Sequence, residues 1–414
     1  MSTLSTWQYR VFGSTWLAYA AYYFCRKPFY MAKPLLTEQF GWDASTLGWL
    51  GSSYLIAYTV GQFIAGAVGT ARGPRVLLVV GMALTAAVNM SLGFVDNLWT
   101  FGALLAVNGL AQATGWSGGV GTMASWFKRR QRGTVMGFWA TNFQFGGVAA
   151  SAFAAWALNR YGIPGTFMAA SWVTLAAWGV VLLWQRDRPE DVGLPPLVDE
   201  EEDAADAAAG PEGDVWTRQL VTNIALMGTF YFFIKFIRYA LWSWAPYLLR
   251  MDYDLGIDEA GYLSTLFDAA GIVGVIVAGV LSDGLFRGRR AGVSFLFVAA
   301  MVGSCVLLAT LGRTDLLWFS LSLALIGFSL YGPDALMSGA GAMDVGSRRQ
   351  AVAAAGVING MGSAGSVLQD IVLGSVLETS GSGTVFAILL ASALCALACL
   401  GALLVRNRRG LADL

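Results

Sequence analysis

The sequence predicts an all-α membrane protein with twelve transmembrane helices arranged in two six-helix domains. Of its 414 residues, 56% are hydrophobic and only 13% are charged, whereas soluble domains carry about 25% charged residues. Apolar runs of about twenty residues recur along the chain, and each is long enough to cross a hydrocarbon core about 30 Å thick. Similar motifs also recur in the two halves of the chain, which predicts a duplicated unit.

The apolar runs define the twelve expected helices. The first run continues well beyond the length of a signal-peptide core, contains charges and is followed by no cleavage site, so we expect it to remain in the mature protein. The expected helices are 8–33, 45–69, 75–94, 98–120, 133–159, 164–184, 218–249, 259–282, 291–311, 315–341, 350–377 and 381–405.

The positive charges predict the orientation of the chain. If the N-terminus is cytoplasmic, eighteen of the 26 Lys and Arg residues fall in inner loops and four fall in outer loops, namely Lys33, Arg160, Arg250 and Arg313. This bias predicts cytoplasmic termini. The remaining four cations lie within the expected membrane segments, where an ionisable residue indicates a functional site; they are Arg26, Lys27, Lys235 and Arg238.

A strongly acidic segment, VDEEEDAADAAAGPEGD at 198–214, separates the two halves. It contains no aromatic residue, so we interpret it as a solvated, disordered cytoplasmic linker. A partner-binding segment is the alternative. The expected domains are therefore an N-terminal six-helix domain at 1–185, a linker at 186–217 and a C-terminal six-helix domain at 218–414.

The two halves share motifs at nearly constant spacing. Arg26 precedes Pro34 as Arg238 precedes Pro246, at an offset of 212 residues, and the triplet Arg-Arg-Gln occurs at both 129–131 and 348–350. A duplicated unit with a two-fold axis along the membrane normal predicts that the two arginines face one central cavity. Planar guanidinium groups donate paired hydrogen bonds to phosphate, so the pair predicts a phosphate-bearing ligand.

Several stretches resemble one transporter family. They are AYAAYYFCRKPFYMAKPLL, NGLAQATGWSGG, FIRYALWSWAPYLL, LFDAAGIVGVIVAGVLSDGLFRG and GFSLYGPDALM. Together they resemble the organophosphate:phosphate antiporter family of the major facilitator superfamily, which includes glycerol-3-phosphate, hexose-6-phosphate and glucose-6-phosphate transporters. The resemblance covers every expected membrane segment. It implies exchange of an organic phosphate ester for inorganic phosphate by alternating access.

The resemblance also implies the residues of the substrate site. Arg26 and Arg238 would bind phosphate, with Lys27 adjacent and Asp268 at a position where the family commonly has an acid. The tyrosines expected to line the cavity are Tyr19, Tyr23, Tyr58 and Tyr331. Three departures put identical substrate choice in question. Gln62 stands where several members of the family have a lysine, and Phe143 and Ser243 stand where the glycerol-3-phosphate transporter has a histidine and an aspartate.

Two further charges are expected at the site. Lys235 shares one helical face with Tyr231, Arg238 and Trp242 by its spacing, and Asp334 lies in an apolar segment. Lys235 could instead pair with Asp268 or Asp334, and Lys27 could face either the cavity or the membrane interface. A structural ion pair or a snorkelling side chain is the alternative for the two arginines.

These features predict a transporter and not an enzyme. The chain has no histidine, and no nucleophile with a matching base or phosphate-binding loop is apparent, so we expect no catalytic residue, cofactor or metal. The expected partners are a phosphorylated small molecule, inorganic phosphate and the lipid bilayer, without nucleic acid, for a monomer in the plasma membrane. The alternatives are a sugar-phosphate receptor, a proton-coupled organic anion symporter and a membrane-embedded enzyme.

Overall fold

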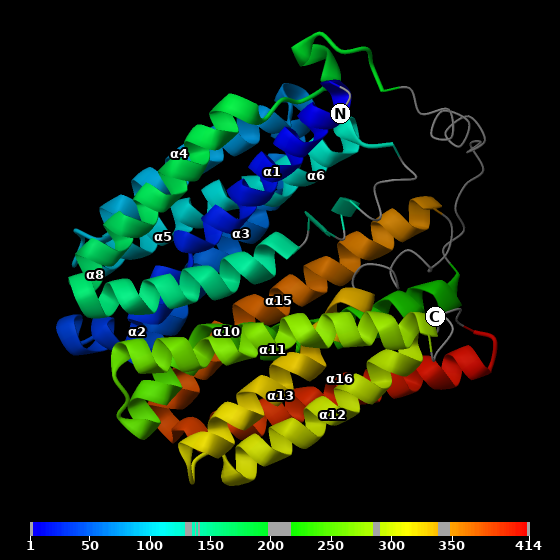
Figure 1. The fold of residues 1–414 in the computed structure, drawn as a ribbon. Coiled ribbons are helices and arrows are strands. Elements are labelled where there is room, and N and C mark those ends of the chain that lie inside the picture. Colours follow the sequence, from blue (N-terminus) through cyan, green and yellow to red (C-terminus); the bar gives the residue numbers. More distant parts are fainter. Residues whose placement is uncertain are drawn as a thin grey trace. The chain divides into compact units, whose positions relative to one another are not determined.

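The computed structural model describes residues 3–128, 135–136, 138–139, 141–197, 217–284, 290–337 and 348–411. Within these residues every regular element is a helix (Figure 1). The first half contains α1 (Thr3–Phe24), α2 (Lys27–Phe40), α3 (Ala44–Arg72), α4 (Pro74–Leu92), α5 (Leu98–Gln112), α6 (Thr114–Trp126), α8 (Thr141–Trp184) and the 3-10 helix η1 (Pro189–Val192). The second half contains α10 (Arg218–Tyr253), α11 (Ile257–Gly284), α12 (Arg290–Leu311), α13 (Leu316–Ala335), α15 (Arg348–Ser380) and α16 (Ser382–Arg408).

The chain forms two compact units. Unit 1 comprises Met1–Leu35 and Ser53–Glu212, and unit 2 comprises Leu36–Ser52 and Gly213–Leu414. The segment 36–52 therefore belongs to unit 2, where Ser52 Oγ donates a hydrogen bond of 2.9 Å to the carbonyl of Val367 on α15. The acidic segment 198–214 lies outside the described residues, and the expected domain boundaries stay a prediction.

The expected transmembrane segments correspond to the helices, with three differences in continuity. The segment expected at 98–120 is divided into α5 and α6 at Ala113. The segments expected at 133–159 and 164–184 are joined in α8, which bends at Gly162 because this residue has φ 64° and ψ −168°. Of the described helices, seven are long and apolar enough to cross a membrane by length and composition.

The third difference is a break in the helix expected at 8–33. α1 ends at Phe24 and α2 begins at Lys27, and the amides of Cys25 and Arg26 bond to carbonyls only three residues earlier. Pro28 explains the break, because proline has no amide hydrogen and its ring clashes with the carbonyl four residues before it, here that of Phe24. The break places Arg26 in a turn between two helices.

The equivalent region of the second half is continuous. α10 runs from Arg218 to Tyr253 through Arg238 and Pro246. At the 212-residue offset that relates the halves, Ala240 stands where the first half has Pro28, and alanine is the best helix former. The two arginines at equivalent sequence positions therefore have different local backbones.

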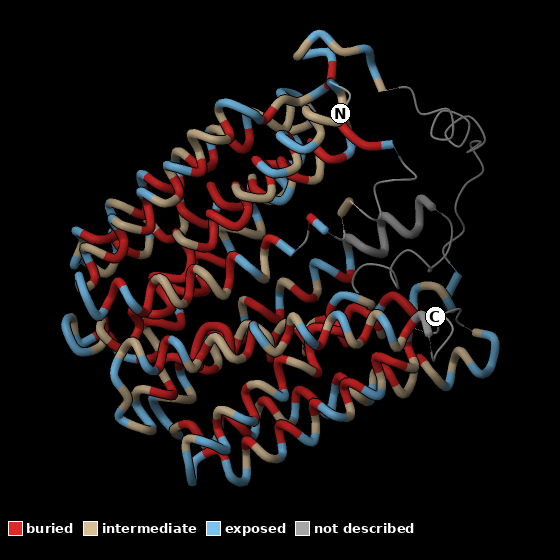
Figure 2. Tube along the Cα trace, in the orientation of Figure 1, coloured by how far each residue is buried: buried red, intermediate tan, exposed pale blue. Residues whose placement is uncertain are grey.

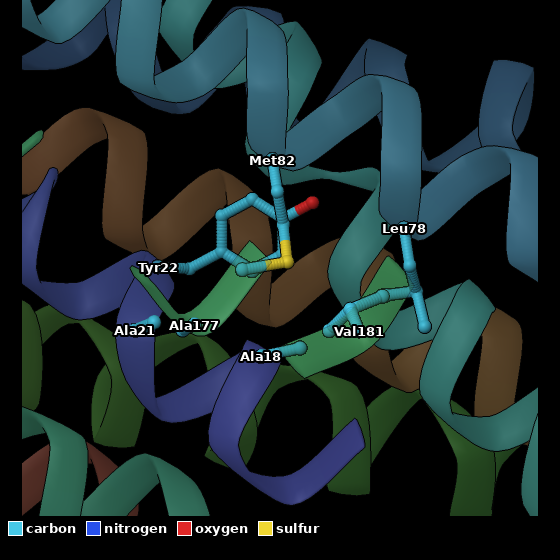
Figure 3. Packing of buried hydrophobic residues seen from close by; sticks show 7 residues of the cluster. All are labelled: Ala18, Ala21, Tyr22, Leu78, Met82, Ala177 and Val181. Carbon is cyan, nitrogen blue, oxygen red and sulfur yellow. The ribbon is translucent and has the colours of Figure 1, made fainter. Parts of the chain in front are cut away.

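The core of unit 1 is formed by α1, α4 and α8. Tyr22 packs against Met82 in a cluster of buried side chains (Figure 3), and its hydroxyl lies 2.9 Å from Thr114 Oγ1. Small residues, including Ala18 and Ala21, allow the helices to approach closely. The full cluster is Ala18, Ala21, Tyr22, Leu78, Met82, Ala177 and Val181.

Large apolar side chains also cover the outer sides of many helices. Buried and exposed positions alternate along the helices (Figure 2), and the exposed positions include Phe63, Trp99 and Leu317. A helix that is apolar on its buried and exposed sides is suited to a lipid environment. The exposed apolar surface therefore agrees with a multi-pass membrane protein.

The start of α4 is capped by a carboxylate that is distant in the sequence. Asp187 Oδ1 accepts a hydrogen bond of 2.6 Å from the amide of Arg75. Gly73 has φ 85°, and a Cβ atom there would overlap the Asp187 carboxylate, so the cap requires glycine. Gly73 and Asp187 line a cavity of about 610 Å³ that does not include Arg26.

Candidate functional site

Arg26 is buried among three tyrosine rings of unit 1. Its Cζ atom lies 4.9 Å from the ring centre of Tyr23, 5.0 Å from that of Tyr58 and 5.5 Å from that of Tyr54. The residue is only 7% exposed. The faces of aromatic rings carry partial negative charge, so these contacts stabilise the buried cation.

A chain of amide side chains on α5 fixes the position of Arg26. Arg26 Nε donates a hydrogen bond of 3.0 Å to Gln112 Oε1, which also accepts one of 2.9 Å from the Tyr54 hydroxyl. Gln112 Nε2 donates to Asn108 Oδ1 at 3.1 Å, and Asn108 Nδ2 donates to the carbonyl of Cys25 at 2.9 Å. α5 therefore supports both the guanidinium and the backbone break.

Sequence reasoning did not single out Tyr54, Asn108 or Gln112 as site residues. The available signal was that Asn108 and Gln112 lie one helical turn apart within an apolar segment and belong to the motif NGLAQATGWSGG. Buried amides in a membrane helix require hydrogen-bond partners. Their spacing could have indicated a shared partner but not which one.

Tyr19 and Gln62 are two further residues predicted for the site in this half of the chain. Tyr19 packs against Tyr23 with ring centres 6.1 Å apart and against Trp116 at 5.8 Å. Gln62 is half-buried on α3, one helical turn after Tyr58, and takes no part in the hydrogen bonds described for Arg26.

Lys27 begins α2 and is 2% exposed. The residue is therefore buried in the protein, and its side chain does not lie at an exposed interface. Lys33, two turns further along α2, is also fully buried, with its Nζ atom 5.3 Å from the ring centre of Tyr30. Sequence reasoning placed Lys33 in an outer loop, so its burial within the helix is a correction.

Arg238 in unit 2 has a charged partner. Its Nη1 atom lies 2.7 Å from Asp334 Oδ2, and the two side chains are 18% and 9% exposed. The guanidinium also lies over the ring of Tyr331, with Cζ 4.7 Å from the ring centre. The Tyr331 hydroxyl donates a hydrogen bond to Asp268 Oδ1. The structure thus brings together Arg238, Asp268, Tyr331 and Asp334.

Lys235 lies on the same helix, one turn before Arg238. Its Nζ atom donates a hydrogen bond of 2.9 Å to Asn359 Oδ1 on α15 and lies 4.9 Å from the ring centre of Tyr231. Tyr231 and Lys235, which were predicted to share a helical face, are therefore in direct contact. Asn359 was not identified from the sequence, because an amide next to glycine carries no distinctive pattern.

A third acid, Asp370 on α15, is fully buried in unit 2. Its Oδ1 atom accepts a hydrogen bond of 2.8 Å from Ser243 Oγ. By the resemblance, Ser243 is the position at which the glycerol-3-phosphate transporter has an aspartate. A carboxylate is therefore present beside this position, but it comes from another helix.

Known proteins are similar to this chain over most of its length. The model of the Major Facilitator Superfamily matches residues 15–369. The chain is 30% identical to the membrane sensor protein UhpC of Salmonella typhimurium, over 90% of this chain and 86% of that protein. It is 28% identical both to a probable hexose phosphate transport protein of Chlamydia pneumoniae and to the glycerol-3-phosphate transporter of Bacillus subtilis, each over 94% of this chain and 90% of the relative.

Solved structures with the same fold have lower sequence identity. A D-xylose-proton symporter has a TM-score of 0.76 at 12% identity, over 95% of this chain and 96% of that one. An inward-facing bacterial homologue of the lysosomal transporter Spinster has a TM-score of 0.70 at 15% identity, over 98% of this chain and 96% of that one. The relatives confirm the predicted resemblance to organophosphate transporters, and the chain belongs to the Major Facilitator Superfamily of membrane transporters, not to a family of enzymes.

Proposed function

We propose that the protein is a secondary active transporter that exchanges an organic phosphate ester for inorganic phosphate by alternating access. Arg26 and Arg238 bind the phosphate group in this proposal. The observation that carries it is the pair of arginines at equivalent repeat positions, both lying over tyrosine rings. Arg26 is buried, and the side chain of Arg238 is 18% exposed. A cation inside a membrane segment is costly, and this cost is typical of a substrate site.

The geometry around Arg26 supports a phosphate ligand. Its described hydrogen bond to Gln112 uses Nε, and the two terminal amino groups take no part in that bond. A guanidinium held at Nε has a fixed plane, so its remaining donors are oriented before the ligand arrives. Lysine would supply the charge without this planar geometry.

The relatives support phosphate esters as the substrate class. Their names include hexose phosphate and glycerol-3-phosphate transport proteins, so both sugar and glycerol phosphates are candidates. A receptor for the same ligands is the second candidate function, because a membrane sensor protein is among the relatives. We further propose that the transporter works as a monomer in the plasma membrane, with both termini in the cytoplasm.

Phosphate counterflow tests this function. Purified protein would be placed in liposomes loaded with radiolabelled inorganic phosphate, and release of the label would be measured when glucose 6-phosphate, glycerol 3-phosphate or 3-phosphoglycerate is added outside. We expect at least one ester to exchange with phosphate. Binding of an ester without flux would support the receptor, and absence of both binding and flux would contradict the proposed substrate class.

A further inference from the structure

The two arginine sites differ in the charges around them. The contacts described for Arg26 are with uncharged side chains, Gln112 and three tyrosines. Arg238 is bonded to the Asp334 carboxylate, and Tyr331 links it to a second carboxylate, Asp268. The ligand-free Arg238 site therefore already holds an anion of its own.

This anion conflicts with a dianionic ligand. A phosphate ester that takes the Nη1 donor of Arg238 takes a charged hydrogen-bond donor away from Asp334. It also adds two negative charges beside a side chain that is only 9% exposed. A buried carboxylate that loses its cation and gains a neighbouring anion is strongly favoured in its neutral form. Protonation of Asp334 removes the repulsion without any movement of the helix.

Asp334 is better placed for this proton than Asp268. Asp334 contacts the guanidinium directly at 2.7 Å, so it competes with the ligand for the same donor. Asp268 accepts its hydrogen bond from the Tyr331 hydroxyl, which is an uncharged donor that the phosphate does not need to displace. A donor to the charged form stabilises that form, so Asp268 keeps its support when ligand binds.

The helices that pack against α13 are α10, α11 and α12. α10 contributes the cations Arg238 and Lys235, and Lys235 Nζ is bonded to Asn359. Asp258 and Glu259 lie in the first turn of α11, more than two helical turns from Asp268. The remaining titratable and charged groups on these elements are Arg218, Tyr231, Tyr239, Tyr247, Arg250, Asp252, Tyr253, Tyr262, Asp268, Asp283, Arg290, Cys305 and Tyr331.

We propose that binding of a dianionic phosphate group to Arg238 is coupled to uptake of one proton by Asp334. The hydrogen bond from Arg238 Nη1 transfers from the Asp334 carboxylate to a phosphate oxygen, and a proton from water adds to the carboxylate oxygen that is released. No covalent bond of the ligand changes. The inference rests on the proposed function, because it requires that a phosphate group binds at this site.

The coupling predicts that ligand affinity depends on pH because a group of the protein, and not the ligand, changes its protonation. Phosphate esters have a second ionisation near pH 6, so between about pH 7.5 and 9 the free ligand is a dianion. Uptake of one proton on binding makes the dissociation constant rise about tenfold per pH unit in this range. Asp334→Asn removes the proton acceptor, so its dissociation constant should stay nearly constant.

The experiment measures binding of glucose 6-phosphate and glycerol 3-phosphate to detergent-purified protein by calorimetry between about pH 7.5 and 9, with proton uptake followed by an indicator dye in weak buffer. We expect about one proton per bound ligand for wild type and none for Asp334→Asn. Asp268→Asn and Glu378→Gln, an exposed acid on α15, serve as matched controls that should keep the pH dependence.

Three results would overturn the inference. One is binding to wild type without proton uptake, which needs no variant and is therefore independent of whether Asp334→Asn folds. Another is an unchanged pH dependence in folded Asp334→Asn, which would place the proton on the ligand or on another group. The third is absence of binding by either ester and by inorganic phosphate, which would also contradict the proposed function, whereas the first two leave it intact.

Discussion

Arg238 and Asp334 form an ion pair with 2.7 Å between Nη1 and Oδ2, whereas Arg26, at the equivalent repeat position, is bonded to the uncharged side chain of Gln112. The duplicated sequence thus carries one arginine in a neutral setting and one with a resident carboxylate. In the proposed site, phosphate would compete with a carboxylate at Arg238, whereas the contacts described for Arg26 are with uncharged side chains. This difference determines what substitutions at each site should do.

Asp334→Asn should bind inorganic phosphate more tightly than wild type and exchange it more slowly. The amide keeps the size of the side chain but removes the competing charge, so Arg238 is available to the ligand and releases it less readily. Asp268→Asn should change affinity less, because Asp268 contacts Arg238 only through Tyr331. Phosphate affinity and exchange rate measured on the same preparations test this, and weaker binding in both variants would show that neither acid competes with phosphate.

Gln112→Leu should weaken substrate binding by about 10- to 100-fold, because a hydrogen bond between a charged group and a buried amide contributes about 1.5–3 kcal/mol. The substitution removes the acceptor shared by Arg26 and Tyr54. Binding of glucose 6-phosphate by calorimetry is the measurement. Gln185→Leu is the matched control, because Gln185 is equally buried in unit 1 but donates to Thr122; an equal loss in both variants would indicate a general packing defect.

Gly271→Ala should reduce both thermal stability and transport. A Cβ atom at Gly271 would overlap the ring of Tyr331, which lies beneath Arg238 and donates to Asp268. Overpacking a buried contact of this kind costs about 1–3 kcal/mol. Gly279→Ala on the same helix meets open space and should behave as wild type. Melting temperature and exchange rate test the pair, and a normal Gly271→Ala protein would show that the position of Tyr331 is not critical.

Most of the fold could be predicted from hydrophobicity. The expected segments coincide with helices because membrane spans have a length set by the bilayer. The break at Cys25 and Arg26 was missed, although Pro28 provides a local signal for it. The assignment of 36–52 to unit 2 could not be predicted, because it depends on contacts with α15 that are distant in sequence.

The sequence allowed the cations of the candidate site and the acid Asp334 to be predicted. Lys235 and the two arginines are conspicuous in apolar segments, and Asp334 was identified for the same reason. The uncharged partners Tyr54, Gln112 and Asn359 were not identified, because neutral polar residues are common in membrane helices and only the packing shows which of them meet. The pairing of Asp334 with Arg238, with Lys235 bonded to Asn359, likewise depends on side-chain geometry.

Phosphate exchange by Arg26→Lys and Arg238→Lys in liposomes tests the central claim most directly. Lysine keeps the charge but loses the planar paired donors, so both variants should lose exchange while folding and expression remain normal. Arg250→Lys is the control, since Arg250 on α10 pairs with Glu38 at 2.6 Å in a solvent-exposed contact. Exchange by Arg26→Lys or Arg238→Lys within about threefold of wild type, less than 1 kcal/mol, would contradict a site built on two arginines.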